Sequence, residues 1–441
     1  MKAGFLFSSD PKVSKLSAKK IAVDDTLGKR KYRLDDFEFE RNIGCGNFSQ
    51  VWHVTLKARP DESYALKIFD VQKVKNKGFV KFVQQERKAM LQLNNPGHPH
   101  VIRMVDTFRD ENNVYLLYEY ADGGELWEEI KNVGVTDKFV ARILVRQLLD
   151  GLEYIHDRGI IHRDLKSENI VIKDRILKII DFGTSQFANA MACGDETDSC
   201  NTERKGTAAK NTGKADNATN TGSRLFCARS KTRCEFENHV GTPNFMSPEA
   251  ISNVFAGYAG DLWSLGCTIY QLLLGINCFT GSSNYFIYKK VKSNQLEFPN
   301  KFDPDAKDLI TQLLVLDPTK RLNLKGIREH KFLSEFNIMP EPSGTLERFV
   351  TLDGKVHQIC CKAQEAIFDL TIKRENVTKA DHQEIEDAIA WLEGRELAAI
   401  ADALKFNYLR TKRQVAEEID EANSYMQDEA RKIDALDNCH T

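Results

Sequence analysis

Three side chains with hard oxygen atoms follow one another closely in the middle of the chain. Asp164 and Asn169 are five residues apart, and Asp181 comes twelve residues after Asn169. A carboxylate can accept a proton from a hydroxyl group, and carboxylate and amide oxygens are the ligands that Mg²⁺ prefers. The spacing therefore predicts a base, Asp164, next to a magnesium site formed by Asn169 and Asp181.

A lysine lies in the middle of an apolar segment further upstream. Lys67 belongs to the run Tyr64–Phe69, in which its neighbours are apolar. An unpaired charge in an apolar strand is costly, so this lysine needs an anionic partner. Two partners are open at this point: Glu86, on the amphipathic helix expected next, and the phosphate of a nucleotide.

A glycine-rich segment, Ile43–Val51, precedes this lysine. Gly44 and Gly46 have no side chains in the way, so their backbone amides can close over a phosphate group, whereas Ser49 stands where a third glycine is usual. Strand-like residues flank the segment on both sides, which excludes a dinucleotide-binding loop because that loop leads into a helix. A phosphate-binding hairpin and a plain hairpin turn both remain open.

The elements that must position these residues change in type along the chain. Alternating apolar residues predict strands, and apolar residues spaced three or four apart predict amphipathic helices. The expected strands are Phe37–Ile43, Gln50–Leu56, Tyr64–Phe69, Val101–Phe108 and Val114–Tyr120, and the expected helices are Val80–Leu93, Phe139–His156 and Asp261–Leu274. The pattern predicts an α+β fold with a β-rich lobe (37–121) followed by a larger α-rich lobe (122–336).

Composition excludes several classes of protein. The 441 residues carry 62 Lys and Arg against 64 Asp and Glu, a net charge of −2 that argues against a dedicated nucleic-acid binder. Ten cysteines are too few and too scattered for a disulfide scaffold, which favours a reducing compartment. The most apolar stretch, Leu262–Phe279, is interrupted by polar residues and is expected to be a buried helix rather than a membrane span. We therefore expect a cytoplasmic protein.

Three further segments differ from the two lobes in composition. Residues 1–36 show no period and are expected to be a flexible leader, and residues 188–236 have too few large apolar side chains to fold, which predicts a low-complexity insertion. Residues 340–441 are expected to form a mostly helical extension, with strand-like residues at Arg348–Val350 and Ile367–Ile372 and a helix stop at Gly394. The pattern leaves open whether Phe406–Thr411 interrupts the last helix.

Taken in order, these motifs resemble the protein kinase family over Phe37–Phe336. The resemblance implies a two-lobed kinase fold with ATP and Mg²⁺ between the lobes. It implies that Asp164 is the catalytic base, that Lys166 neutralises the transferred phosphoryl group, and that Glu86 holds Lys67 against the phosphates. The nucleotide site implied in this way comprises Ile43, Gly44, Cys45, Gly46, Asn47, Phe48, Ser49, Val51, Ala65, Lys67, Glu119, Ala121, Glu125, Glu168, Asn169 and Asp181, of which Asn169 and Asp181 would hold the metal.

The same resemblance assigns supporting roles. Tyr118 would be the gatekeeper next to adenine, Asp261 would brace the catalytic loop, and Glu249 would pair with Arg321. Lys166, two residues after the base, is similar to the serine/threonine branch. The segments Asp181–Ser185, Val240–Glu249, Asp261–Leu272 and Leu314–Leu322 most resemble the phosphoinositide-dependent protein kinases of the AGC group. That likeness implies protein substrates, including the activation loops of other kinases in intracellular signalling.

The sequence departs from that subfamily at three places. Asn238 stands at the position of the activation-loop serine, so Glu235 or Glu237 would have to supply the negative charge that faces Arg163. The subfamily has a regulatory pocket behind the helix that carries Glu86. In this sequence Val71 stands where the subfamily has a lysine, whereas Arg87 keeps one phosphate-binding charge of that pocket. The extension is helical and does not resemble a PH domain, so it is expected to pack on itself or on a helical partner protein. Another serine/threonine kinase subfamily, or a pseudokinase scaffold acting through its insertion and tail, are the alternatives.

Overall fold

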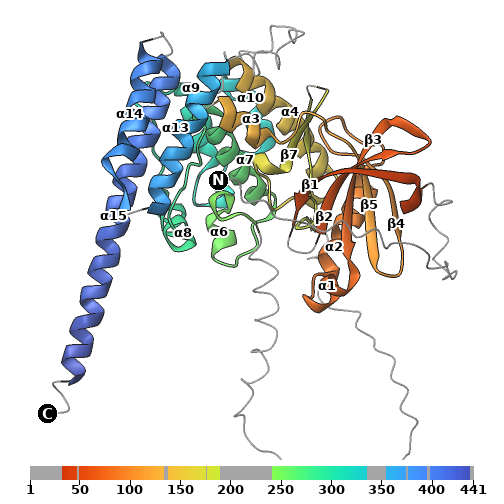
Figure 1. Ribbon diagram of the computed structural model, residues 1–441, viewed down its shortest axis with the longest axis horizontal. Helices are drawn as coiled ribbons and strands as arrows, with labels where there is room; N and C mark the ends of the chain where they lie inside the picture. The colour runs from red at the N-terminus through yellow and green to blue at the C-terminus, as the bar shows by residue number, and fades with distance from the viewer. Residues whose placement is uncertain are drawn as a thin grey trace, which may run out of the picture.

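The chain folds into a β-rich small lobe, an α-rich large lobe and a helical extension (Figure 1). The computed structural model describes residues 32–46, 49–133, 138–174, 176–188, 241–334, 354–373, 376–394 and 398–437. The predicted loop residues Asn47 and Phe48, the leader up to residue 31, the insertion from residue 189 on and the strand-like residues Arg348–Val350 lie outside the described residues. The two-lobed α+β architecture expected from the sequence is confirmed.

The small lobe is built on an antiparallel five-stranded sheet with the order β1-β2-β3-β5-β4. Along β5, Tyr115 and Leu117 face one core while Leu116 and Tyr118 face the other, as the two-residue period of a strand requires. The five strands are β1 (Phe37–Cys45), β2 (Ser49–Leu56), β3 (Arg59–Asp70), β4 (Met104–Arg109) and β5 (Asn113–Glu119). Helix α2 covers the face of the sheet that carries Tyr118, so the side chains of β5 on that face pack against the helix.

The two small-lobe helices are α1 (Val71–Asn76) and α2 (Val80–Leu93). Asp70 caps α1 by accepting a hydrogen bond from the backbone of Lys73 at 2.9 Å, so Val71 is the first helical residue. Helix α2 has the predicted bounds, and its apolar stripe is buried except at Val80, which is 39% exposed. Val80 is the first residue of α2, so the buried part of the stripe begins at Val83.

The lobe begins before the predicted boundary. Tyr32 is buried against the rings of Phe37 and Tyr64, and its backbone amide donates to Asp106 at 3.2 Å. A short 3₁₀ helix, Leu34–Asp36, then leads into β1. Residues 32–36 are therefore part of the folded lobe and do not belong to a flexible leader; an isolated tyrosine followed by charged residues has no period that would reveal this.

The large lobe surrounds helix α7 (Gly257–Leu274), in which every residue from Asp261 to Leu274 is buried. The predicted buried helix is confirmed, and none of the described helices is long and apolar enough to cross a membrane. The other helices of the lobe are α3 (Leu126–Val133), α4 (Lys138–Asp157), α6 (Pro248–Ile251), α8 (Asn284–Lys292), α9 (Pro304–Leu313), α10 (Leu324–Glu329) and α11 (Lys331–Ser334). Two small two-stranded antiparallel sheets pair β6 (Ile160–Ile161) with β9 (Gln186–Phe187) and β7 (Ile170–Lys173) with β8 (Ile176–Ile179).

The extension is a bundle of the helices α13 (Gly354–Lys373), α14 (Lys379–Glu393) and α15 (Ala398–Asp437), which share one apolar core. The strand predicted at Ile367–Ile372 is wrong, since Ile367 and Leu370 belong to α13 and pack at helical spacing while Phe368 is exposed. A six-residue apolar window does not distinguish the two periods. Helix α14 ends at Gly394 as predicted, and α15 runs unbroken through Phe406–Thr411.

The bundle lies against the large lobe of its own chain, with α13 beside α3 and α15 beside the loop that follows α7 (Figure 1). On α15, Asn407 donates to the carbonyl of Leu274 at 3.1 Å. Gln414 and Glu418 accept hydrogen bonds from Thr280 and from the backbone of Ser282, at 2.7 and 3.1 Å. The bundle therefore packs both on itself and on the large lobe.

Candidate active site

Lys67 projects from the middle of β3 toward two carboxylates. Its Nζ donates to both oxygens of Glu86, at 2.8 and 2.9 Å, and to Oδ1 of Asp181 at 3.1 Å. Burial alone would lower the pKa of Lys67, but the charges of Asp181 and Glu86 raise it above its ordinary value. The lysine charge holds the pKa of Asp181 down, to about 2. The open question from the sequence is thus answered: Glu86 is a partner of Lys67, and Asp181 is a second one.

Glu86 is buried at the centre of α2 and is held by two side chains. Besides Lys67, the hydroxyl of Tyr118 on β5 donates to its Oε1 at 2.9 Å. Burial raises the pKa of Glu86 above its usual value, and the charge of Lys67 opposes this. The family resemblance implied that Tyr118 is the gatekeeper next to adenine, but it did not imply this contact with Glu86.

The predicted base, Asp164, lies in a network of donors. The amide of Asn169 donates to its Oδ2 at 3.0 Å, and Lys166 lies 3.1 Å from the same oxygen. Thr242 donates to Oδ1 through its backbone N–H at 2.9 Å and through its hydroxyl at 3.1 Å. Lys166 also donates to the Thr242 hydroxyl at 2.5 Å. The structure therefore brings Asp164, Lys166 and Asn169 together, as predicted.

Thr242 is a site residue that the sequence reasoning missed. It lies 78 positions after Asp164, and the only signal was its place directly after Gly241 in the segment Val240–Glu249. Gly241 has a φ of +117°, and a β-carbon there would lie 3.1 Å from the carbonyl oxygen of Arg163. A glycine is needed at that position because the backbone must approach the catalytic loop closely.

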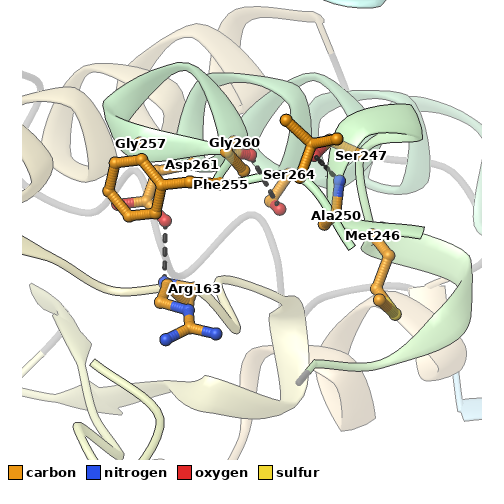
Figure 2. A pocket seen from close by; sticks show the side chains of 11 residues that line it. Arg163, Met246, Ser247, Ala250, Phe255, Gly257, Gly260, Asp261 and Ser264 are labelled. Carbon is orange, nitrogen blue, oxygen red and sulfur yellow. Dashed lines mark hydrogen bonds between the residues drawn. The ribbon is translucent and has the colours of Figure 1, made fainter. Parts of the chain in front are cut away.

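Asp261 of α7 holds the backbone of the catalytic loop, the segment that carries Asp164. Its carboxylate accepts from the backbone amides of His162 and Arg163, both at 2.8 Å, and lies 2.8 Å from Nε2 of His156. Burial would raise the pKa of Asp261, but the hydrogen bond with His156 and the neighbouring imidazoles hold it below the usual value. Arg163, Asp261 and Ala250 of α6 are among the residues that line a small cavity of about 30 Å³. Figure 2 shows the hydrogen bond between the backbone of Arg163 and Asp261 at this cavity. The predicted brace is present.

A buried ion pair joins α6 to the residue that follows the short 3₁₀ helix Pro318–Lys320. Arg321 donates to both oxygens of Glu249, at 2.5 and 2.7 Å, and also to the carbonyl of Ala259 at 2.9 Å. Two parallel hydrogen bonds fix the orientation of both groups. The pairing of Glu249 with Arg321 that the resemblance implied is thus present.

The glycine-rich segment forms the turn between β1 and β2. Gly44 pairs with Val51 and Cys45 with Gln50, and the amide of Gly46 donates to the carbonyl of Ser49 at 2.8 Å. The strand–turn–strand arrangement expected from the flanking residues is therefore present. Strand β2 then pairs with β3, so that Val51 of β2 lies opposite Lys67 of β3. Ala65 lies two residues before Lys67 on β3, so the glycine-rich segment, Lys67 and Ala65 are close together in the sheet.

The segment between the lobes begins at Glu119. Its backbone amide donates to the carbonyl of Arg103 at 3.0 Å, and its carboxylate pairs with Lys173 at 2.8 Å and Lys178 at 3.0 Å. Those lysines lie on β7 and β8, so the Glu119 side chain ties the inter-lobe segment, which continues to Ala121, to the large lobe. The resemblance had implied only backbone contacts for Glu119.

Two acidic residues border this region. Glu125 is exposed and forms a β-bridge with Val171 of β7. Burial and the charges of Glu128 and Glu168 raise the pKa of Glu125. Glu168, in the short 3₁₀ helix Ser167–Asn169, accepts a hydrogen bond from Ser167. The two predicted residues therefore lie near enough for their charges to interact.

Asn169 and Asp181 fit a divalent cation. The amide nitrogen of Asn169 is used by Asp164, which leaves its amide oxygen as the ligand atom, and the depressed pKa of Asp181 keeps its carboxylate ionised. The backbone amide of Ile180 donates to the carbonyl of Asn169 at 2.9 Å, which connects the two segments. In the described part of the chain no three His, Cys, Asp or Glu side chains gather into a metal cluster. A pair of oxygen ligands suits Mg²⁺, which takes its remaining ligands from phosphates and water.

Comparison with known proteins agrees with this geometry. The protein kinase domain family matches residues 37–208 and 223–333. The chain therefore belongs to the protein kinase family. Within that family it resembles the phosphoinositide-dependent protein kinases of the AGC group, as the sequence motifs predicted.

Three curated relatives illustrate that likeness. The chain is 34% identical over 294 residues to human putative 3-phosphoinositide-dependent protein kinase 2, covering 66% of this chain and 63% of the relative. It is 34% identical over 294 residues to human 3-phosphoinositide-dependent protein kinase 1, covering 66% of this chain and 45% of the relative. It is 32% identical over 303 residues to the fission yeast (Schizosaccharomyces pombe) serine/threonine-protein kinase ksg1, covering 68% and 46%. The chain thus spans about half to two thirds of the length of these relatives.

Two of the predicted departures have different outcomes. Asn238, Glu235 and Glu237 lie outside the described residues. In the regulatory pocket, Val74 and Val83 are buried in the small-lobe core.

Proposed function

We propose that this chain is an active kinase that transfers the γ-phosphate of ATP to serine or threonine hydroxyls of other proteins. The observation that carries this proposal is that both halves of the site are assembled in one structure. Lys67 is paired with Glu86 on the small-lobe side, and Asp164 is held by Asn169, Lys166 and Thr242 on the large-lobe side. A scaffold without activity would not need both arrangements.

Asp164 is the group that accepts the hydroxyl proton as the phosphoryl group is transferred. Its two oxygens already receive hydrogen bonds from Thr242 and Asn169, which fix the carboxylate in one orientation. Lys166 lies beside it and places a positive charge where negative charge develops on the phosphoryl oxygens. Little covalent work is needed from the protein, since positioning and charge stabilisation lower the barrier of phosphoryl transfer.

Lys67 would bind the nucleotide phosphates while Glu86 keeps its side chain aimed into the site. The backbone of the β1–β2 turn, together with Val51 and Ala65, would cover the nucleotide, and Glu119 and Ala121 would bind adenine through their backbone. Asn169 and Asp181 would hold Mg²⁺, which neutralises phosphate charge when it is bound. Glu125 and Glu168 would border the ribose and the substrate.

The substrate class follows from the relatives. Two proteins named as 3-phosphoinositide-dependent protein kinases are each 34% identical to this chain over 294 residues, which supports a similar substrate class. We propose activation-segment peptides of other kinases as substrates, and action in the cytoplasm as part of intracellular signalling. A helical partner that binds the extension is also a proposal.

The test is an assay of the purified full chain with Mg²⁺, labelled ATP and a panel of activation-segment peptides. Asp164→Asn should lower phosphate transfer to background, because the amide cannot accept the proton. Its nucleotide affinity, measured by calorimetry, should stay within about threefold of wild type because the carboxylate is not a nucleotide ligand here. Transfer by the Asp164→Asn variant at the wild-type rate, or a wild type that transfers no phosphate to any peptide, would contradict the proposal.

A further inference from the structure

A buried tyrosine hydroxyl is directed at the ion pair that anchors the nucleotide site. Tyr118 is the sixth residue of β5, and its Oη donates to Oε1 of Glu86 at 2.9 Å. Tyr118 is 8% exposed and Glu86 is 2% exposed. Neither the proposed proton transfer nor the contacts to ATP use this hydroxyl.

The carboxylate of Glu86 depends on its donors because it is buried. Among the described residues its side-chain donors are Lys67 and Tyr118. Lys67 is already shared with Asp181, and it must also serve the nucleotide phosphates when ATP binds. A buried carboxylate that loses a donor pays a large desolvation cost, so a second, permanent donor keeps Glu86 in place while Lys67 is shared.

The tyrosine is well placed to be that permanent donor. Burial and the negative charge of Glu86 raise the pKa of Tyr118 well above its usual value, so the hydroxyl stays protonated. The residue pairs with Ala65 of β3 on one side and with Met104 of β4 on the other, in the interior of the sheet. The contact therefore fixes the centre of α2 to a rigid strand.

We propose that Tyr118 is a positioning residue for phosphoryl transfer: its hydroxyl holds the carboxylate of Glu86, and through it α2 and Lys67, in the arrangement that the reaction requires. This inference rests on the proposed function, because it assigns a role within the same site. Tyr118 itself touches no reacting atom. Its effect should therefore appear in the rate of transfer and vanish when Glu86 can no longer accept a hydrogen bond.

The chain offers a matched control on the same strand. Tyr115 is also buried on β5, and its hydroxyl donates to a carboxylate, that of Asp110, at 2.7 Å, but it faces the opposite core. Tyr118→Phe and Tyr115→Phe each remove one hydroxyl from one strand and keep the ring. We expect Tyr118→Phe to lower kcat about tenfold, as for a lost hydrogen bond to a charged group, with the KM for the peptide unchanged. Tyr115→Phe should keep the wild-type kcat.

A double-mutant cycle separates positioning from general loosening. Glu86→Met keeps the length of the side chain but removes both acceptors, so adding Tyr118→Phe to it should change kcat less than about twofold. A kcat for Tyr118→Phe equal to that of wild type would overturn the inference. So would an equal loss in both tyrosine variants, or a tenfold further loss in the Glu86→Met background.

A second measurement does not depend on activity. Amide hydrogen exchange of the full chain should be faster in α2 for Tyr118→Phe than for wild type or Tyr115→Phe, because the anchor of the helix is gone. Unchanged exchange in α2 would overturn the inference. If wild type transfers no phosphate while α2 loosens as expected, the proposed function fails and the anchoring by Tyr118 stands.

Discussion

Arg410 attaches the C-terminal extension to the large lobe through three hydrogen bonds. It is buried on α15, and its guanidinium donates to the carbonyl oxygens of Asn277, at 3.2 Å, and Cys278, and to the hydroxyl of Tyr270 at 3.1 Å. The perturbation we consider is Arg410→Ala. It leaves two carbonyls of the loop after α7 without their charged donor: that of Cys278, which is buried, and that of Asn277, which is partly buried.

The magnitude follows from those two carbonyls. A hydrogen bond from a charged donor contributes about 1.5–3 kcal/mol, so two of them set an upper value of about 3–6 kcal/mol. Water that enters the space left by the side chain recovers part of this. The Tyr270 hydroxyl keeps its own hydrogen bond to the carbonyl of Glu297, at 2.9 Å, and adds little to the loss. We expect a free energy of docking that is about 3 kcal/mol less favourable.

The control is Arg413→Ala, one turn further along α15. The guanidinium of Arg413 is 56% exposed and pairs with Glu297, which is also exposed. An exposed pair of this kind contributes only about 0–1 kcal/mol. The two variants therefore remove the same side-chain type from the same helix, and only the first removes buried contacts.

Amide exchange along α15 and thermal unfolding measure the result. For Arg410→Ala, exchange in the part of α15 that faces the lobe should rise by about two powers of ten, and the Arg413→Ala variant should resemble wild type. Equal exchange in all three proteins would refute the reasoning, because it would show that the buried contacts do not hold the bundle on the lobe.

Three other outcomes are expected. Burial lowers the pKa of Lys290 from 10.5 to about 8. The contribution of Lys290 to the stability of the folded state is therefore largest above pH 10.5 and is lost as the pH falls to about 8. Lys290→Met should remove this pH dependence from the free energy of unfolding, measured by chemical denaturation. Arg321→Met should destabilise the large lobe by about 3–5 kcal/mol in the same assay, since Glu249 would be left buried without its partner; a loss below about 1 kcal/mol would contradict this. Because Asn238 cannot carry a phosphate, phosphatase-treated protein should keep most of its activity, and complete loss would instead point to a phosphorylated residue elsewhere that serves Arg163.

Much of the candidate site could be predicted because its residues belong to short, periodic segments. Helix α2 has the bounds that its apolar spacing predicted, and Lys67 lies in the strand that its neighbours indicated. A charge inside an apolar strand demands a partner, which is why Glu86 was among the candidates before any contact was visible. Local patterns also predicted the turn between β1 and β2 and the stop at Gly394.

Short windows were misleading where two periods fit the same residues. Ile367–Ile372 is apolar enough for a strand, but in α13 its members join a stripe that α14 and α15 cover. Tyr32 is one apolar residue among charged ones, and only its contacts with Phe37 and Tyr64 make it part of the lobe. In both cases the deciding interactions come from partners that the local sequence does not contain.

The sequence by itself determined the family, the order of the catalytic groups and the division into lobes and extension, because each depends on residue type and spacing along the chain. Only the tertiary structure decided which groups meet across it. Thr242 reaches Asp164 from 78 positions away, Tyr118 reaches Glu86 from 32, and Arg410 reaches Cys278 from 132. Such contacts arise when separate elements pack around shared cores, and no period within one segment records the direction in which another segment will present its side chains.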